Sequence, residues 1–332
     1  MGCASSQVNW STLDGEPPAV IAHRGDSGAY PEHTFAAYRS ALEKGADFIE
    51  PDIVLTKDGV PVCRHDLELE KTTDVAARPK FADRKANGKN WLTTDFTLAE
   101  IKTLRATQPA KGRDRSMDGK YAIPTLSELF DLVYDYNQTH GTNTGLLIEI
   151  KNPDRHRVIN LDVNLASVDV INAKAAEGKT LPIIYQCFDR SACERIVGLT
   201  DAPVHWLSSK QIDLADLPKG ISGLGLKKSL IDLADGRSAL IDAAHAQGVR
   251  VHAWTFRDDR LPKGIDPKQP ADEMLPYLRA GLDGVITDFP ETGVAARKAI
   301  LDELQAERKS EGPISERARR QSSRRLMKIG VR

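Results

Sequence analysis

The chain has 332 residues, of which 40% are hydrophobic and 28% charged, with 46 Lys and Arg against 47 Asp and Glu. This composition excludes disorder throughout the chain and allows a large core, such as a single α/β barrel of about 250 residues. No stretch approaches the ~18 consecutive apolar residues that cross a bilayer. The formal net charge of −1 argues against a surface built to bind nucleic acid, so we expect no nucleic acid partner and a local site for a small molecule.

The N-terminal sequence Met-Gly-Cys-Ala-Ser-Ser leaves three interpretations open. It fits the end of a bacterial lipoprotein signal without its apolar part, a myristoylation sequence through Gly2 and Ser6, or a frayed terminus. We expect residues 1–17 to form a tail, and membrane contact only through such a lipid anchor. The cysteines have neither a C-x-x-C pair nor zinc-site spacing, so they assign no compartment; they are Cys3, Cys63, Cys187 and Cys193.

Short β-rich runs alternate with helical patterns, as in βα units around a parallel sheet. The eight predicted strands are Ala19–Gly25, Phe48–Leu55, Gly145–Lys151, Pro182–Phe188, Val204–Ser209, Gly220–Leu226, Val249–Phe256 and Gly284–Phe289. The predicted helices are Thr34–Lys44, Leu126–Tyr136, Leu161–Glu177, Ser191–Leu199, Ser238–Gln247 and Ala271–Ala280. This order predicts a (β/α)₈ TIM barrel over residues 18–298, whose reactive groups lie at the C-terminal ends of the strands.

A ninth β-like run, Val60–His65, follows the second strand after the turn Thr56-Lys57-Asp58-Gly59. The Asp-Gly turn predicts a hairpin. Residues 67–124 then form a long polar connection with one helical pattern, Thr97–Leu104, so the barrel carries an insertion over residues 60–124. Connections of this length in a barrel typically build or cover the mouth of a site.

Residues 299–332 are expected to hold the end of the last helix and a basic tail. The segment 311–332 has seven Lys and Arg and two acidic residues, a local charge of +5. This pattern favours a solvated, disordered tail, and attraction to an anionic surface is the alternative.

Two strand ends place histidines at the predicted barrel mouth. The first strand ends in Ala22-His23-Arg24-Gly25, and the hairpin run ends in Arg64-His65-Asp66. The planar guanidinium of arginine suits phosphate or carboxylate because it donates two parallel hydrogen bonds. Histidine exchanges protons near neutrality, and two histidines can act as base and acid on opposite sides of one bond.

Two strands carry charged residues at alternate positions. Glu50 and Asp52 share one strand face, and Glu149 and Lys151 repeat the arrangement on the next predicted strand. Carboxylates that point into a barrel repel one another and lose their hydration, so at least one should be protonated unless a cation lies between them. An exposed charged strand face is the alternative. Hard oxygen ligands without an H-E-x-x-H helix favour calcium or magnesium, and the sequence does not choose between them.

Several familiar motifs are missing from the sequence. There is no G-x-S-x-G elbow, no P-loop and no G-x-G-x-x-G after a strand. Serine hydrolases, P-loop enzymes and dinucleotide-dependent oxidoreductases therefore lose support.

Taken together, these residues resemble the signature of the glycerophosphodiester phosphodiesterases. The likeness begins with Ile21-Ala22-His23-Arg24-Gly25, Tyr30-Pro31-Glu32-His33-Thr34, Glu50-x-Asp52 with Thr56-Lys57-Asp58-Gly59, and His65-Asp66. It continues in Thr72-Thr73-Asp74-Val75, Asp95-Phe96-Thr97-Leu98, Ile148-Glu149-Ile150-Lys151, Gln186-Cys187-Phe188-Asp189 and Thr287-Asp288-Phe289-Pro290, and so covers roughly residues 18–295. The Pro-Glu-His-Thr and Gln-Cys-Phe-Asp runs look most like the bacterial periplasmic or lipoprotein branch.

The resemblance implies hydrolysis of glycerophosphodiesters, such as glycerophosphocholine or glycerophosphoethanolamine, to sn-glycerol 3-phosphate and an alcohol. It implies a divalent cofactor, calcium before magnesium, and a periplasmic or cell-envelope location, with the cytoplasm left open. Position by position, it implies an acid/base pair of His23 and His65, metal ligands Glu50, Asp52 and Glu149, and phosphate-binding Arg24 and Lys151. Which histidine is the acid stays open.

Three further residues have two interpretations each, and a fourth has one. Phe188 and Trp254 either line the pocket against the glycerol or the alcohol, or pack within the barrel. Asp288 either hydrogen-bonds to the site or caps a helix, and His252 is expected to be a hydrogen-bonded interior histidine.

The alternative functions are a lysophospholipase D-type phosphodiesterase on the same barrel and a non-catalytic, surface-anchored binding protein.

Overall fold

The computed structural model describes residues 8–85 and 88–329, with side chains up to Ser310. The predictions on Gly2, Cys3 and Ser6 lie outside the described residues. Among the described residues, no helix combines the length and the apolar character that a membrane crossing requires.

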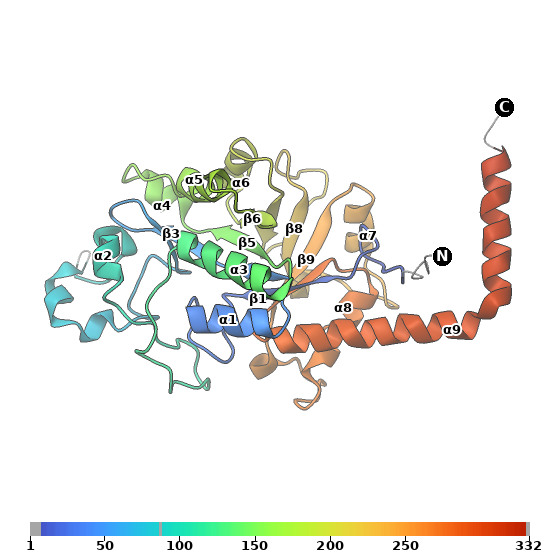
Figure 1. Cartoon of the computed structure of the whole chain (residues 1–332), viewed down its shortest axis with the longest axis horizontal. Helices are drawn as coiled ribbons and strands as arrows, with labels where there is room; N and C mark the ends of the chain where they lie inside the picture. Colours follow the sequence, from blue (N-terminus) through green and yellow to red (C-terminus); the bar gives the residue numbers. More distant parts are fainter. Residues whose placement is uncertain (1–7, 86–87, 330–332) are drawn as a thin grey trace.

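The predicted TIM barrel is confirmed, with helices arranged around a closed parallel sheet (Figure 1). The stave formed by β2 and β3 closes the barrel between β1 and β5. The strands are β1 (Ala19–His23), β2 (Phe48–Glu50), β3 (Asp52–Leu55), β4 (Pro61–Cys63), β5 (Gly145–Ile150), β6 (Ile183–Cys187), β7 (Val204–Ser208), β8 (Gly223–Lys227), β9 (Arg250–Phe256) and β10 (Gly284–Thr287).

The second predicted strand is interrupted at Pro51, which has no N–H to donate to a neighbouring strand. Beyond this break, β4 runs antiparallel to β3 and pairs Ile53 with Cys63, which confirms the hairpin.

Helices cover the outside of the barrel and bury their apolar faces against the outward side chains of the strands. They are α1 (Phe35–Glu43), α2 (Leu98–Ile101), α3 (Leu126–His140), α4 (Pro153–Arg157), α5 (Val163–Ala176), α6 (Arg190–Val197), α7 (Ala239–His245), α8 (Leu275–Arg279) and α9 (Pro290–Ile329). The predicted helix Ala271–Ala280 is instead a 3₁₀ turn, Pro270–Glu273, followed by α8. Pro276 fits the first turn of α8, where a missing N–H costs nothing, but would break the interior of a longer helix.

The insertion over residues 60–124 forms a small core of its own beside the barrel. Its predicted helix is confirmed in shorter form as α2, which Thr97 and Glu100 cap reciprocally. The segment also contains the 3₁₀ turns Val75–Ala77, Pro79–Arg84 and Thr93–Asp95. Figure 1 shows α2 at one end of the molecule and the far part of α9 projecting at the other.

Helix α9 continues without a break past residue 298, so the expected helix end and basic tail lie within it. The disordered tail that the charge pattern favoured is therefore not what the structure describes up to Ile329. Pro313 lies in the interior of this helix, where it lacks an N–H for the helical hydrogen bond, and the helix bends sharply along its course (Figure 1).

Two buried histidines lie inside the barrel, one on β7 and one on β9. The rings of His205 and His252 meet edge to face with centroids 4.7 Å apart. Gly223 leaves the space for His205, because a Cβ there would lie 2.4 Å from its Cδ2 atom. The expectation of a hydrogen-bonded His252 is wrong, since its buried Nδ1 has no hydrogen-bond partner among the described residues.

Candidate active site

The polar end of the barrel gathers the residues that the sequence singled out. Parallel pairing places His23 beside Glu50, the last residues of β1 and β2, and it places Asp52, the first residue of β3, beside Glu149 near the end of β5. A pocket opens there among these side chains. Its lining includes eight of the nine predicted site residues, namely His23, Arg24, Glu50, His65, Glu149, Lys151, Phe188 and Trp254.

The ninth residue, Asp52, lies in a buried carboxylate cluster with Glu50 and Glu149. One oxygen from each of the three lies within 4.8 Å of the others. Burial, and then repulsion by Asp52 and Glu149, raise the pKa of Glu50 well above its ordinary value. Burial raises the pKa of Glu149 as well. Three carboxylates this close are unfavourable without a cation.

The cluster fits a divalent metal ion. All its donors are carboxylate oxygens, which calcium and magnesium prefer, and Asp52 Oδ1 is buried without a hydrogen bond among the described residues. Although burial raises the pKa of Asp52, the charges of Lys151, His65 and Arg24 hold it well below its ordinary value. At least one ligand therefore stays ionised at neutral pH.

Two cations hold the carboxylate cluster in place. Lys151 Nζ lies 2.6 Å from Glu149 Oε1, and Arg24 Nε lies 3.1 Å from Asp52 Oδ2. Arg24 has a φ of 59°, in the strained left-handed region, and its backbone N–H donates to Glu50 Oε2. Because both side chains also line the pocket, they are placed to hold a phosphate beside the carboxylates.

The two histidines differ in their surroundings. His23 is buried, and its Nδ1 lies 2.6 Å from Asp288 Oδ1. Burial, and then the charge of Arg24, lower the pKa of His23 below its ordinary value. His65 is more open, with 32% of its side chain exposed, and its Nδ1 lies 2.8 Å from Asp66 Oδ1. In both rings Nδ1 is hydrogen-bonded to a carboxylate. The other ring nitrogen, Nε2, is therefore the one that can exchange a proton with a ligand.

The hydrogen-bonding interpretation of Asp288 is supported, because its carboxylate lies against His23. Arg113 and Arg257 contact its other oxygen, Arg113 at 2.5 Å and Arg257 at 2.9 Å. The sequence contained no local signal for either arginine. Arg113 lies 175 residues from Asp288 along the chain and reaches it only because the insertion folds over the mouth.

Glu32 and His33 also support the site, although the sequence analysis gave them no role. Glu32 Oε2 accepts a hydrogen bond from Arg24, and His33 Nε2 lies 2.9 Å from Asp52 Oδ2. Burial raises the pKa of Glu32, but Arg24 and other cations outweigh it and lower the pKa to about 2. Both residues belong to the Pro31-Glu32-His33-Thr34 run, which was the available signal.

Phe188 and Trp254 form an aromatic wall along one side of the pocket. Their rings meet edge to face with centroids 5.5 Å apart, and the Trp254 indole donates to the Gly225 carbonyl. Phe188 remains 42% exposed at the mouth. This geometry places both rings where the pocket-lining interpretation needs them.

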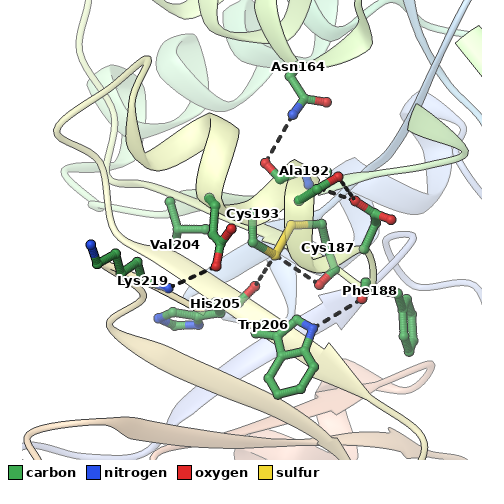
Figure 2. The surroundings of a disulfide bond; sticks show 12 residues. Asn164, Cys187, Phe188, Ala192, Cys193, Val204, His205, Trp206 and Lys219 are labelled. Atoms are coloured by element: carbon green, nitrogen blue, oxygen red, sulfur yellow. Dashed lines mark hydrogen bonds between the residues drawn. A yellow bond between two sulfur atoms is a disulfide. The ribbon is translucent and has the colours of Figure 1, made fainter. Parts of the chain in front are cut away.

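A disulfide joins the end of β6 to α6, beside the aromatic wall. Figure 2 shows the bond between Cys187 and Cys193, whose Cα atoms are 5.9 Å apart. Trp206 donates from its indole to the carbonyl of Phe188 in the same region (Figure 2). Cys187 lies between Gln186, which donates to Glu50 Oε1, and Phe188, so the crosslink anchors a strand end that contributes to the pocket.

A TIM barrel with a carboxylate cluster, two cations and two histidines at its mouth is an architecture suited to an enzyme that acts on phosphate esters. Residues 23–292 match the model of the glycerophosphoryl diester phosphodiesterase family, and the chain belongs to that family. The predicted family is thus confirmed, while the bacterial periplasmic branch stays a prediction.

Relatives at the sequence level span nearly the whole chain. A glycerophosphodiester phosphodiesterase of Arabidopsis thaliana is 32% identical over 82% of this chain and 84% of its own length. One from Haemophilus influenzae is 28% identical over 90% of this chain and 95% of its own length.

Solved structures are similar as well. A glycerophosphoryl diester phosphodiesterase from Silicibacter pomeroyi, named as putative in its description, shares the fold with a TM-score of 0.66 at 22% identity, over 88% of this chain and 98% of that chain. An Oleispira antarctica phosphodiesterase in complex with the product sn-glycerol-3-phosphate has a TM-score of 0.62 at 25% identity, over 86% of this chain and 98% of that chain.

Proposed function

We propose that this chain hydrolyses glycerophosphodiesters, including glycerophosphocholine and glycerophosphoethanolamine, to sn-glycerol 3-phosphate and an alcohol. The observation that carries the proposal is the convergence of the carboxylate cluster and both histidines on one pocket. The family membership supports it, as does the product sn-glycerol-3-phosphate bound to the similar Oleispira enzyme.

Glu50, Asp52 and Glu149 would hold a divalent ion, calcium before magnesium. When bound, such an ion supplies positive charge that stabilises the phosphoryl oxygens as negative charge builds on them. Burial and then the repulsion by Asp52 and Glu149 raise the pKa of Glu50, and the ion would relieve the repulsion.

The protein groups around the ion have complementary roles. Arg24 and Lys151 bind and orient the non-bridging phosphate oxygens. One histidine takes the proton of the attacking water or glycerol 2-hydroxyl, and the other gives a proton to the alcohol oxygen as its bond to phosphorus breaks. If the 2-hydroxyl attacks, the product is a cyclic phosphate, and water then breaks its bond between phosphorus and the 2-oxygen to give sn-glycerol 3-phosphate. Phe188 and Trp254 pack against the carbon atoms of the glycerol or the alcohol.

The test is a coupled assay for sn-glycerol 3-phosphate released from glycerophosphocholine by the full chain. We expect release that EDTA abolishes and that readded calcium or magnesium restores. Lysophosphatidylcholine in the same assay format, with choline as the readout, tests the lysophospholipase D alternative. No release from either compound in the presence of metal would contradict the enzymatic proposal and favour a binding protein.

We also propose that the chain works in an oxidising compartment, such as the periplasm or cell envelope. The disulfide between Cys187 and Cys193 supports this proposal, because such bonds persist outside the reducing cytoplasm. Alkylation of free thiols during cell lysis, followed by peptide mass spectrometry, tests it. Alkylation of both cysteines would contradict the proposed compartment.

A further inference from the structure

A second pocket adjoins the active site and shares His23, Arg24 and Arg257 with it. Arg113 and Arg260 line this second pocket and not the first. We call it the arginine pocket, defined by Arg24, Arg113, Arg257 and Arg260.

Guanidinium groups outnumber carboxylates in the lining of the arginine pocket, although Arg24 and Arg113 also pair with Asp52 and Asp259 outside this lining. Its lining contains the four guanidinium groups and two carboxylates, Glu32 and Asp288. Both carboxylates are already engaged, Glu32 with Arg24 and Asp288 with His23 and two arginines. Arg260 is exposed, and among the described residues no carboxylate pairs with its side chain.

The wall of the arginine pocket is held in place before any ligand binds. The side chain of Arg113 is 8% exposed, and it donates to the Ser27 carbonyl and to both oxygens of Asp259. Gln108, which is 2% exposed, donates to the carbonyls of Ser27 and Tyr30. A pocket wall fixed in this way loses little entropy when an anion binds beside it.

The two pockets correspond to the two arms of a phosphodiester held at His23 and Arg24. The first pocket has the carboxylate cluster and the aromatic wall of Phe188 and Trp254, which suit the hydroxyl groups and carbon atoms of glycerol. The glycerol arm carries no charge in any glycerophosphodiester. A pocket rich in arginine is therefore complementary to the alcohol arm, and to an alcohol that carries an anion.

We propose that the arginine pocket binds a second phosphate on the alcohol side of the substrate. The enzyme would then prefer glycerophosphodiesters of phosphorylated alcohols over those of choline, whose positive charge the pocket repels. The inference rests on the proposed function and specifies its substrate class.

The test uses three diesters with the same glycerol arm. Bis(glycerophospho)glycerol carries the second phosphate, glycerophosphoglycerol has the same central glycerol without it, and glycerophosphocholine carries a cation. We expect kcat/KM to be highest for bis(glycerophospho)glycerol, with an advantage that shrinks at high salt because the contact is ionic.

Substitutions at Arg260 identify the pocket. We expect Arg260→Ala to lower the ratio of kcat/KM for bis(glycerophospho)glycerol over glycerophosphoglycerol about fivefold, and Arg260→Glu to lower it further. Arg237→Ala is the matched control, because Arg237 is an exposed arginine paired with Asp242 outside both pockets. The control should leave the ratio unchanged.

Two outcomes separate this inference from the proposed function. Turnover of all three diesters with a ratio that Arg260→Glu does not change would overturn the arginine pocket and leave the phosphodiesterase intact. Absence of all turnover would contradict the proposed function instead. In that case, calorimetric titration of the full chain with bis(glycerophospho)glycerol still tests the arginine pocket as a binding site. Equal affinity for wild type and Arg260→Glu would overturn this inference.

Discussion

His23 and Asp288 join the first and last strands of the barrel through a contact of 2.6 Å between Nδ1 and Oδ1. Because an ionised carboxylate only accepts, the contact fixes the proton on Nδ1 and leaves Nε2 to exchange protons with a ligand. Burial raises the pKa of Asp288, but His23, Arg257 and Arg113 outweigh it and keep the pKa far below its ordinary value. Asp288 is thus a positioning residue with a permanent negative charge.

Replacing Asp288 with Asn should remove the carboxylate that holds the His23 ring in its orientation and fixes its tautomer. The amide can offer an N–H to the ring and favour the wrong tautomer, so we expect kcat to fall by about 10² to 10⁴. The pH profile of kcat/KM should also change its shape, which a merely structural role would not cause. Asp259→Asn is the matched control, because Asp259 contacts Arg113 but not His23. Equal kinetics for both variants would contradict the positioning role.

The acid and base roles of His23 and His65 can be separated through the leaving group. Each alanine substitution should lower turnover of glycerophosphocholine by about 10² to 10⁴. A glycerophosphodiester of p-nitrophenol needs little protonation as its bond to phosphorus breaks, so only the variant that lacks the acid should recover turnover. Turnover near the wild-type rate for both variants on glycerophosphocholine would contradict the assignment of this pair.

Metal binding should be measurable without turnover. An ion that binds the folded chain alone stabilises it by about 2.7 kcal/mol at a concentration of 100 times its Kd. Glu50→Gln removes one carboxylate from the proposed ligands, so more calcium or magnesium should be needed for the same rise in the free energy of unfolding.

The matched control for this titration is Glu273→Gln. Glu273 is buried like Glu50, but it pairs with Lys228 and lies outside the carboxylate cluster. Its substitution should lower the free energy of unfolding itself and leave the metal-dependent increment unchanged. Identical metal titrations for wild type and Glu50→Gln would argue against a metal at the cluster.

The sequence predicts the parts of this site that follow from local periodicity. Glu149 and Lys151 alternate with buried isoleucines, and this spacing fixes which strand face they share. The closed barrel then brings Glu149 beside Asp52, as the order of strands implies.

The parts that the sequence did not predict depend on long-range packing. Arg113 lies in the insertion, where no periodic pattern indicates which way a side chain points, and its contact with Asp288 exists only in the folded chain. The unpartnered ring nitrogens of His205 and His252 also depend on long-range packing, because only the packed barrel removes both rings from water. A sequence pattern can predict that a histidine points into a barrel, but it cannot show whether another residue lies within hydrogen-bond distance of the ring.

These two interior histidines should make the fold sensitive to mild acid. Burial lowers the pKa of His252 to about 4 and that of His205 well below its ordinary value. In the unfolded chain both histidines protonate near pH 6.5, whereas in the folded chain they stay neutral to lower pH. The free energy of unfolding is therefore unaffected by these groups above about pH 6.5 and decreases as the pH falls toward about 4. For His252 the loss corresponds to about 3 kcal/mol.

Urea unfolding at about pH 7.5 and about pH 4.5 measures this effect directly. We expect His252→Leu, an apolar side chain for the same buried space, to narrow the difference in the free energy of unfolding between the two pH values. Buried His33, whose pKa burial lowers to about 4, remains in both proteins, so its own acid sensitivity cancels in the comparison. His140→Gln, at an exposed helix end, serves as the control. If wild type and His252→Leu lose equal stability on acidification, protonation of the interior pair does not govern the acid response of the barrel.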